Sequence, residues 1–243
     1  MTTPRLYDEF APWWHVMSAP AEYEEEASLY ARAFREHARK PVRTVLEIGS
    51  GGGNNASHLK RGFTMTLVDR SPDMLAQSRF VNPECEHLEG DMRTLHLGRT
   101  FDAVFIHDAI MYMTTEDDLR AVFATAFAHL DEGGMALFVP DRTAENYVPT
   151  TSSGGHDTPE RSMRYLQWEH PAHGQTILTS FVYAFREGSN PVRIEYDEHQ
   201  MGLFSRDVWL AGIADAGFEA RAIPYEHSDF EGAPAREMFV GLC

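Results

Sequence analysis

A glycine-rich stretch, Gly49-Ser50-Gly51-Gly52-Gly53, is the part of the sequence best suited to hold a ligand. It follows an apolar run at 42–48 that predicts a short buried strand, and it precedes Asn54-Asn55-Ala56, which can begin a helix. Glycine has no Cβ, so the backbone can turn tightly and a ligand can lie against it. The first amide groups of the helix have no partner within it and point back at the turn. A strand, a glycine turn and a helix make half of a nucleotide-binding site.

Three kinds of ligand compete for this turn. A phosphate-binding P-loop needs Lys and Ser or Thr after its last glycine, and Asn54-Asn55 stand there, which excludes it. A nicotinamide or flavin fingerprint needs Gly-x-Gly-x-x-Gly; Gly49 and Gly51 fit, but Asn54 takes the third place. S-adenosylmethionine carries a sulfonium and an α-ammonium group, and Glu47, just before the glycines, would attract these cations. The pattern favours S-adenosylmethionine, with a ligand-free turn as the structural alternative.

Two acids downstream have positions that suit the rest of such a ligand. Asp69 follows a strand predicted at 64–68, where an acid can hydrogen-bond two ribose hydroxyls. Glu86-His87-Leu88-Glu89 leads into Gly90-Asp91-Met92, a third short strand predicted to end on an acid, and Asp91 at that end could accept a hydrogen bond from an adenine amino group. Strand-terminal acids also cap helices, so each acid alone is a weak signal. Together with Glu47 and the glycines they form a consistent set.

His107, Asp108 and Asp141 follow the strands predicted at 101–106 and 135–139. Methyl transfer from a sulfonium mainly requires proximity and alignment, and a base helps only when the nucleophile is protonated. We expect His107 and Asp108 to serve as the base and Tyr112 to orient the acceptor. In the structural alternative His107 contacts only the cofactor, Asp108 begins a helix and Tyr112 packs.

Strands and helices alternate between 42 and 141, which predicts a parallel, doubly wound sheet with ligands beyond the carboxyl ends of its strands. Ser71-Pro72-Asp73 is typical of a helix start, and a helix from Thr115 is expected to stop at Gly133-Gly134. Residues 5–40 are expected to be helical and to cover the sheet. Runs at 163–168, 176–185 and 192–196 predict an antiparallel insertion after a loop at 150–155. A helix from Ser205 and a hairpin of 218–225 with 237–242 complete the chain.

Size and composition limit the function. With 243 residues, 43% of them hydrophobic, the chain can form one large domain with a real core. A formal charge of −16 disfavours nucleic acid as a partner and leaves small molecules open. No apolar run has the length of a membrane span, and no signal segment follows Met1, so we expect a cytoplasmic protein. Cys85 and Cys243 give neither a disulfide framework nor a metal site, and His170-Pro-Ala-His173 lacks further ligands, so no metal is expected.

Five motifs together resemble the class I S-adenosylmethionine-dependent methyltransferases: Val45-Leu46-Glu47-Ile48-Gly49-Ser50-Gly51-Gly52-Gly53, Leu67-Val68-Asp69-Arg70-Ser71-Pro72-Asp73-Met74, Glu89-Gly90-Asp91-Met92, Phe101-Asp102-Ala103-Val104 and Leu130-Asp131-Glu132-Gly133-Gly134. The resemblance implies an α/β fold: a Rossmann-like, doubly wound, seven-stranded, mostly parallel sheet whose last strand is antiparallel. It divides the chain into a helical lid at 1–40, a cofactor-binding core at 41–141 and 201–243, and a substrate-side insertion at 142–200.

The resemblance also implies a cofactor site. Glu47 and Gly49 would hold the methionine end, Asp69 the ribose, and Asp91 with Met92 the adenine. A tyrosine in the family's N-terminal lid corresponds to Tyr7. The full set of expected cofactor residues is Tyr7, Glu47, Gly49, Ser50, Gly51, Gly53, Asp69, Arg70, Met74, Asp91, Met92 and His107.

Within that family, the insertion and Glu198-His199-Gln200-Met201-Gly202-Leu203-Phe204-Ser205 are similar to bacterial enzymes that N-methylate nucleotide-linked aminosugars. Those enzymes carry a histidine where this chain has Tyr112. We therefore expect methyl transfer to N or O of a small molecule in secondary metabolism, by a protein that could form a homodimer. The alternatives are a nicotinamide-dependent oxidoreductase and a cofactor-binding protein without catalysis. For His156, His170, His173 and His199 we expect solvent or hydrogen-bonding roles.

Overall fold

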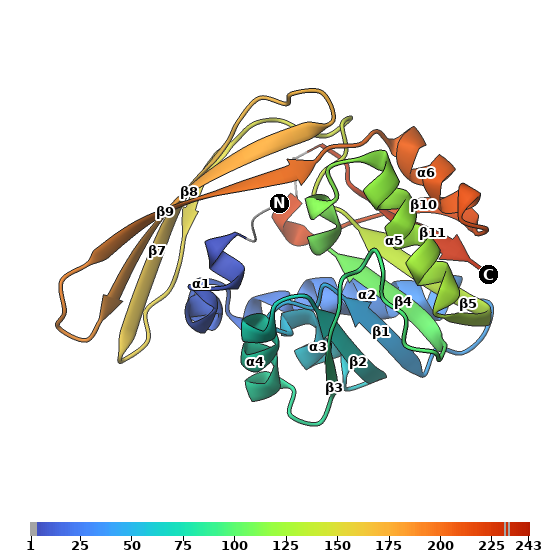
Figure 1. Cartoon of the computed structure of the whole chain (residues 1–243), viewed down its shortest axis with the longest axis horizontal. Coiled ribbons are helices and arrows are strands. Elements are labelled where there is room, and N and C mark those ends of the chain that lie inside the picture. Colours follow the sequence, from blue (N-terminus) through green and yellow to red (C-terminus); the bar gives the residue numbers. More distant parts are fainter. Residues whose placement is uncertain (1–3, 231, 233) are drawn as a thin grey trace.

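The computed structural model describes residues 4–230, 232 and 234–243. Seven strands form one sheet in the order β10-β11-β5-β4-β1-β2-β3 (Figure 1); β11 pairs antiparallel with both β10 and β5, and the other neighbouring strands pair in parallel. The predicted doubly wound, mostly parallel sheet with an antiparallel last strand is confirmed. Its strands are β1 (Thr44–Ile48), β2 (Thr64–Asp69), β3 (Glu86–Glu89), β4 (Phe101–His107), β5 (Leu130–Val139), β10 (Glu219–Pro224) and β11 (Glu237–Leu242).

Helices cover both faces of this sheet, because strand residues alternate between two apolar clusters. On one face, Val104 and Ile106 of β4 lie in a cluster with Phe123 of α5 (Glu116–Ala128) and Trp209 of α6 (Arg206–Asp215). On the other, Phe105 lies in a cluster with Tyr30 of α2 (Glu24–His37) and with residues of α3 (Asn54–Leu59). Parallel strands buried on both sides leave only their ends open to ligands.

Two of the predicted helix starts are confirmed by their caps. The Ser71 side chain accepts a hydrogen bond from Met74 N at the start of α4 (Pro72–Val81), with Pro72 at the first helical position. The Ser205 side chain accepts from Val208 N at the start of α6. Each cap fixes where the chain turns from a strand or loop into a helix.

A second sheet, in the order β6-β7-β8-β9, extends from the core as a long twisted arm (Figure 1). Its strands are β6 (Thr151–Gly154), β7 (Arg161–Glu169), β8 (Thr176–Glu187) and β9 (Arg193–Gly202), all paired antiparallel. The antiparallel insertion is thus present, although β9 continues to Gly202. The predicted loop at 150–155 is wrong, because most of it forms the edge strand β6 paired with β7.

Proline explains why the N-terminal segment is less helical than expected. Only α2 is long; before it come η1 (Arg5–Tyr7), η2 (Ala11–Trp13), α1 (Trp14–Met17) and η3 (Pro20–Tyr23). Pro12 and Pro20 occupy the first turn of η2 and η3, where a missing N–H is tolerated, but neither residue could continue a preceding helix. The segment packs on the second sheet, where Phe10 and Trp13 contact Phe185.

Two boundaries differ from prediction. The helix from Thr115 ends at Ala128, and Gly133-Gly134 lie inside β5 instead of ending the helix. The chain enters the sheet as soon as the helix ends, since Phe101 N donates to His129 O and β4 pairs with β5 across a register shift. The third strand ends at Glu89, so Asp91 and Met92 follow it in a turn.

Candidate active site

The glycine turn lies between β1 and α3, as predicted. Gly49 has φ +76°, and a Cβ there would lie 2.5 Å from the Cβ of Ala109 and 3.1 Å from the terminal methyl of Met92. Gly51 lies over Met74, which is fully buried. Gly49 therefore needs to be glycine for both its backbone angle and its space. The turn also brings Met92 and the residue after Asp108 to the end of β1.

Glu47 lies at this end of β1 with only 4% of its surface exposed, and its Oε2 has no hydrogen-bond partner. Glu26 Oε1, Ser50 Oγ and Asn55 Oδ1 are likewise buried without partners. Burial raises the pKa of Glu47 to about 8, although the charge of His107 opposes the shift. Buried oxygens that lack donors fit a cationic ligand that donates hydrogen bonds, such as an ammonium group.

Asp69 ties the turn to the next helix. Its Oδ2 accepts from Gly51 N at 2.8 Å, and its Oδ1 accepts from Ser71 N at 2.9 Å. Burial raises the pKa of Asp69, and the two backbone hydrogen bonds oppose that shift. A carboxylate oxygen has more than one acceptor site, so Asp69 can hold the turn and still accept from ribose hydroxyls.

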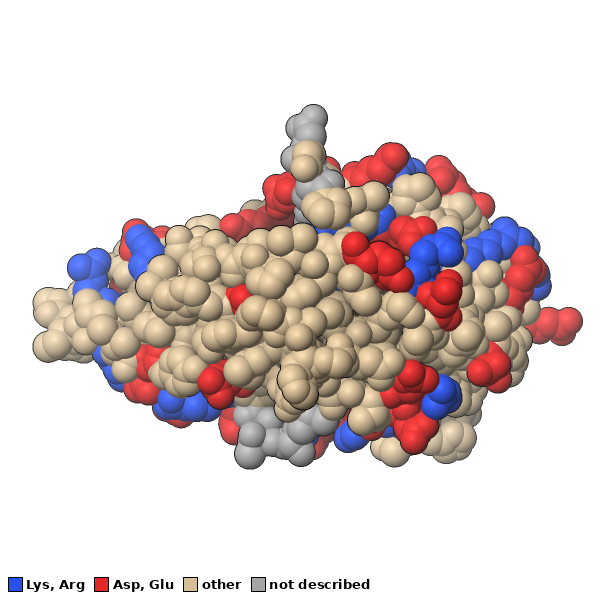
Figure 2. Space-filling model, turned by 90° about the horizontal axis from the view of Figure 1, so that it is seen from above, with Lys and Arg blue, Asp and Glu red and all other residues tan. Residues whose placement is uncertain are grey.

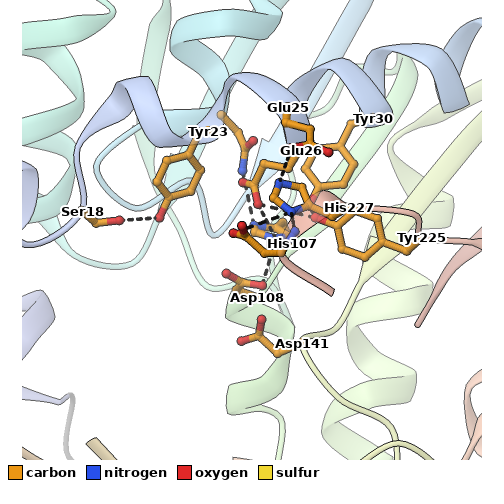
Figure 3. Close-up of polar contacts among 12 residues, drawn as sticks. Ser18, Tyr23, Glu25, Glu26, Tyr30, His107, Asp108, Asp141, Tyr225 and His227 are labelled. Carbon is orange, nitrogen blue, oxygen red and sulfur yellow. Dashed lines mark hydrogen bonds and ion pairs between the residues drawn. The ribbon is translucent and has the colours of Figure 1, made fainter. Parts of the chain in front are cut away.

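His107 is the centre of a second cluster (Figure 3). Its Nε2 lies 2.9 Å from Asp108 Oδ1 and 3.9 Å from Glu26 Oε2, while Asn55 Nδ2 lies 3.3 Å from its Nδ1. Figure 3 shows Asp141 with its carboxyl group turned toward Asp108. Strand β4 and the loop after β5 thus bring His107, Asp108 and Asp141 together, and α2 adds Glu26.

The charges of this cluster are set by burial and by one another. Burial disfavours a charge on His107, but Asp108 and Glu26 outweigh it and raise the pKa of His107 to about 10. His107 is therefore a cation at neutral pH and does not suit the role of a base. Burial and the charge of Asp108 raise the pKa of Asp141 to about 7. Burial opposes ionisation of Asp108, but the charge of His107 outweighs it and lowers the pKa of Asp108, so Asp141 is the aspartate of the pair that holds a proton below about pH 7.

Asp108 holds an unusual backbone conformation, with φ 36° and ψ −51°. It is the only non-glycine residue with positive φ among those described. Such a conformation costs on the order of 1–3 kcal/mol and is concentrated at functional sites. About half of the Asp108 side chain, 45%, is exposed, so the group remains within reach of a ligand.

Tyr7 and Tyr112 form a third group, together with His199. Their hydroxyl oxygens are 2.8 Å apart, and Tyr112 Oη also lies 2.8 Å from Nδ1 of His199. The backbone carbonyl of Tyr7 accepts from the Ser71 hydroxyl beside Asp69. Asp108, Asp141 and Asp69 all act electrostatically on the Tyr7 phenol, so Tyr7 is near both the glycine turn and the aspartate pair.

Two predicted residues stand apart. Asp91 is engaged by Arg93, whose Nη2 lies 2.7 Å from Asp91 Oδ2 and whose Nη1 reaches Asp118 at 3.0 Å. These hydrogen bonds lower the pKa of Asp91 and turn its carboxylate toward Arg93. Arg70 is exposed. A role for either residue toward the cofactor stays a prediction.

The sequence reasoning missed Glu26, Asn55, Trp14 and the pair Asp197 and His199 as parts of this region. Trp14 Nε1 donates to Asn54 Oδ1 at 3.3 Å, and its ring fills the space that a Cβ on Gly52 would need. Asp197 and His199 carried a readable signal, because polar residues two apart in a strand face the same side. Nothing in the acidic run Glu24-Glu25-Glu26 distinguishes Glu26.

No group of three or more His, Cys, Asp and Glu side chains within the described ranges is arranged to hold a metal ion. None of the helices in those ranges combines the length and apolar character of a membrane span.

A Rossmann-like sheet with a glycine turn, a buried acid just before the turn and a second buried acid at the end of the next strand is typical of a class I S-adenosylmethionine-dependent methyltransferase. The family described as "Methyltransferase domain" matches residues 45–134. A putative methyltransferase of a Geobacillus species is 30% identical, covering 92% of this chain and 93% of the relative. The chain therefore belongs to this family of enzymes, and its cofactor is S-adenosylmethionine. This assignment replaces the alternative of a nicotinamide-dependent oxidoreductase.

Other similar proteins act on aminosugars. The dTDP-3-amino-3,6-dideoxy-alpha-D-glucopyranose N,N-dimethyltransferase of Streptomyces fradiae is 27% identical, covering 91% of this chain and 85% of that protein. The structure of CalS10 with bound cofactor, an amino pentose methyltransferase of Micromonospora echinaspora, has a TM-score of 0.74 at 24% identity. It covers 90% of this chain and 91% of its own, and at that identity it supports the fold alone.

Proposed function

We propose that this enzyme methylates the amino nitrogen of a small acceptor, an aminosugar linked to a nucleotide. The observation that carries the proposal is the aspartate pair, Asp108 with Asp141, beside the glycine turn. An amine reaches the enzyme largely as a cation, and the two neighbouring carboxyl groups would attract it to the carboxyl ends of the strands. The similarity to aminosugar N,N-dimethyltransferases supports this acceptor class.

The geometry gives each residue a distinct role in this proposal. Glu47, with the unpaired oxygens of Glu26 and Asn55, would hold the α-ammonium group of the cofactor, and Asp69 would hold its ribose. When bound, the cofactor supplies an already activated methyl group. Asp108 would contact the acceptor amine, and His107, as a cation 2.9 Å from Asp108, fixes that carboxylate in place.

Tyr112 and Tyr7 would orient the acceptor from the other side. Alignment of this kind contributes up to about 7–11 kcal/mol to bimolecular reactions in model systems. The N-terminal segment and the second sheet would then form the acceptor side of the enzyme, with residues 41–141 and 201–243 on the cofactor side.

The test is a matched acceptor pair. A nucleotide-linked aminosugar and its analogue with hydroxyl in place of amino are each incubated with enzyme and methyl-labelled cofactor. We expect label only on the amine, and at least tenfold lower kcat/KM for Asp108→Asn and for Asp141→Asn, with unchanged affinity for S-adenosylhomocysteine. Asp117→Asn, on an α5 residue whose side chain is 95% exposed, is the control. Label on the hydroxyl analogue but not on the amine would contradict the proposal.

We also infer a cytoplasmic enzyme that does not bind nucleic acid, in line with its charge of −16. The outer face of the second sheet bears exposed apolar side chains, with few charges over it (Figure 2): Leu166, Trp168, Ile194 and Tyr196. It is the part of the surface where two copies of an acidic chain could meet with the least repulsion. A homodimer stays a prediction, which sedimentation velocity would check.

A further inference from the structure

Helix α4 packs against β2, β3 and α3, next to the glycine turn that joins β1 to α3 (Figure 1). Met74, Ser78 and Asn82 follow one another at intervals of four residues, with Asn82 as the C-cap of the helix. Their side chains therefore lie on one face of α4. All three residues are completely buried. Met74 lies under Gly51, and the two polar residues continue the same face toward the end of the turn.

Ser78 and Asn82 meet Gly53, the last residue of the turn. Asn82 Nδ2 donates to the Gly53 carbonyl at 2.8 Å, and that carbonyl also accepts from Ser57 N at 3.0 Å, within the first turn of α3. A Cβ on Gly53 would overlap both Ser78 Oγ and Asn82 Nδ2, and Gly53 has φ +75°. The two side chains thus touch the backbone at the point where the turn becomes a helix, and only glycine fits there.

The partners of this polar group fix the direction of each hydrogen bond. The Cys85 carbonyl can only accept, so His87 Nδ1, 3.0 Å away, carries the proton, and His87 Nε2 accepts from the Ser78 hydroxyl at 2.9 Å. Burial lowers the pKa of His87, which keeps its ring neutral at neutral pH. Ser78 Oγ then accepts from Asn82 Nδ2 across a longer distance, 3.4 Å. The Asn82 amide nitrogen serves Gly53 and Ser78, while Asn82 Oδ1 has no partner among the described residues.

An apolar residue would be the ordinary occupant of such a buried helix face. Burial of an amide costs free energy that its hydrogen bonds largely only recover, so stability alone does not account for Asn82. What the amide adds is a fixed point for the Gly53 carbonyl. The start of the turn is held from β2, because Gly49 N and Ser50 N donate to Val68 O at 2.8 and 3.0 Å. Asn82 holds its end from α4.

We propose that Asn82 is a positioning residue for the cofactor, which holds Gly53 and with it the glycine turn in the place where the turn can lie against S-adenosylmethionine. Asn82 acts through Gly53. A turn that is held at both ends is already ordered before the cofactor arrives, and binding is tighter when it does not have to order its own site. The inference rests on the cofactor and not on the acceptor, so it holds for any methyl acceptor.

Calorimetry with S-adenosylhomocysteine tests the proposal without any acceptor. We expect Asn82→Ala to bind about 3- to 10-fold more weakly than the wild type, as the loss of one neutral hydrogen bond implies. Asp102→Asn is the matched control, because Asp102 Oδ2 also holds a backbone group, Thr44 N at 3.0 Å, but at the opposite end of β1. It should lower stability and leave affinity unchanged. Equal affinity of Asn82→Ala and the wild type would overturn the proposal.

Hydrogen exchange followed by mass spectrometry separates a loosened turn from a loosened fold. We expect faster exchange in Asn82→Ala for peptides that cover 49–57, where Gly51 N is bonded to Asp69 and Gly53 N to Ser50 O, and unchanged exchange for β4. Equally accelerated exchange in both regions would mean that Asn82 only stabilises the fold, and the positioning role would be wrong.

Asn82→Asp gives a readout that lost packing cannot imitate. The carboxyl group that it introduces can donate to the Gly53 carbonyl while protonated and cannot donate once ionised, and burial raises its pKa above the ordinary value of about 4. We therefore expect affinity close to that of the wild type at acid pH and a growing deficit as pH rises. The deficit of Asn82→Ala should be the same at each pH.

The titratable groups around Asn82 are His87, Cys85 and Lys60, whose Nζ donates to the Val81 carbonyl at 2.6 Å. All three remain in both variants and in the wild type, so their own titration cancels in the comparison. An affinity deficit of Asn82→Asp that does not change with pH would overturn the proposal. If that variant does not fold, calorimetry and hydrogen exchange of Asn82→Ala decide the question.

Discussion

Glu47→Gln should make the cofactor-free enzyme more stable while it weakens cofactor binding. Glu47 is 4% exposed, and its pKa is raised from an ordinary 4.5 to about 8. A raised pKa in an acid means that the folded chain holds a proton that the unfolded chain has released. Stability is therefore lost as pH rises from about 4.5 to about 8, and the loss is complete above that range.

The size of the effect follows from the shift. One pKa unit corresponds to about 1.4 kcal/mol, so Glu47 costs roughly 3 kcal/mol of unfolding free energy at pH 7 and about 5 kcal/mol above pH 8. Between pH 6 and pH 9 the wild type should lose about 3 kcal/mol that Glu47→Gln does not lose. Removal of a hydrogen bond to a charged group costs about 1.5–3 kcal/mol, so S-adenosylhomocysteine should bind about 10- to 150-fold more weakly.

Urea unfolding at a series of pH values measures the first effect, and calorimetry with S-adenosylhomocysteine measures the second. Glu89→Gln, at an exposed acid that ends β3, is the matched control and should change neither. Parallel pH dependence of the wild type and Glu47→Gln, or equal affinity, would refute the reasoning that a buried, unpaired carboxylate awaits a cation.

Three other substitutions test separate parts of the structure. Asp102→Asn should lower the unfolding free energy measured in urea by about 2 kcal/mol at pH 7 and leave cofactor affinity unchanged. Burial opposes ionisation of Asp102, but hydrogen bonds from Thr44 and Lys40 outweigh it and lower the pKa of Asp102 to about 2. Equal stability of the variant and the wild type at pH 7 would contradict this. That stabilisation should disappear as pH falls from about 4 to 2. Gly52→Ala should weaken S-adenosylhomocysteine binding in calorimetry, since the added Cβ would lie 2.0 Å from the Trp14 ring. Adding Trp14→Ala to the same chain should then restore part of the affinity. If it does not, the loss comes from a changed backbone at Gly52 and not from the clash with Trp14. Ser71→Ala should lower thermal stability by about 1 kcal/mol through the lost helix cap, and an unchanged melting temperature would show the cap to be dispensable.

The seven-stranded sheet and its glycine turn could be predicted because their signals are local. A strand followed by Gly49 and Gly51, and Asp69 at the end of the next strand, each lie within a few residues of the structure they form. The sheet order then follows from the alternation of strands and helices. Element boundaries are harder to predict where tertiary structure overrides propensity, as at Gly133-Gly134, which lie inside β5 at the register shift between β4 and β5.

The contacts of Tyr7, Tyr112 and His199 could not be predicted, because they join distant segments. Tyr112 meets His199 from 87 positions away, and Tyr7 meets Tyr112 across 105. Periodicity assigns His199 to a strand but cannot say which face of that strand meets another element. Glu26 is one of three consecutive glutamates, and only the orientation of α2 selects it as the partner of His107.

The N-terminal segment touches both halves at once. Trp14 rests on Gly52 and His15 lies 3.0 Å from the Gly52 carbonyl, while Leu6 N binds Asp197 on the second sheet. A molecule that displaces this segment on one side must alter its contacts on the other, so occupancy of the two sides is energetically linked, and by the same factor in each direction.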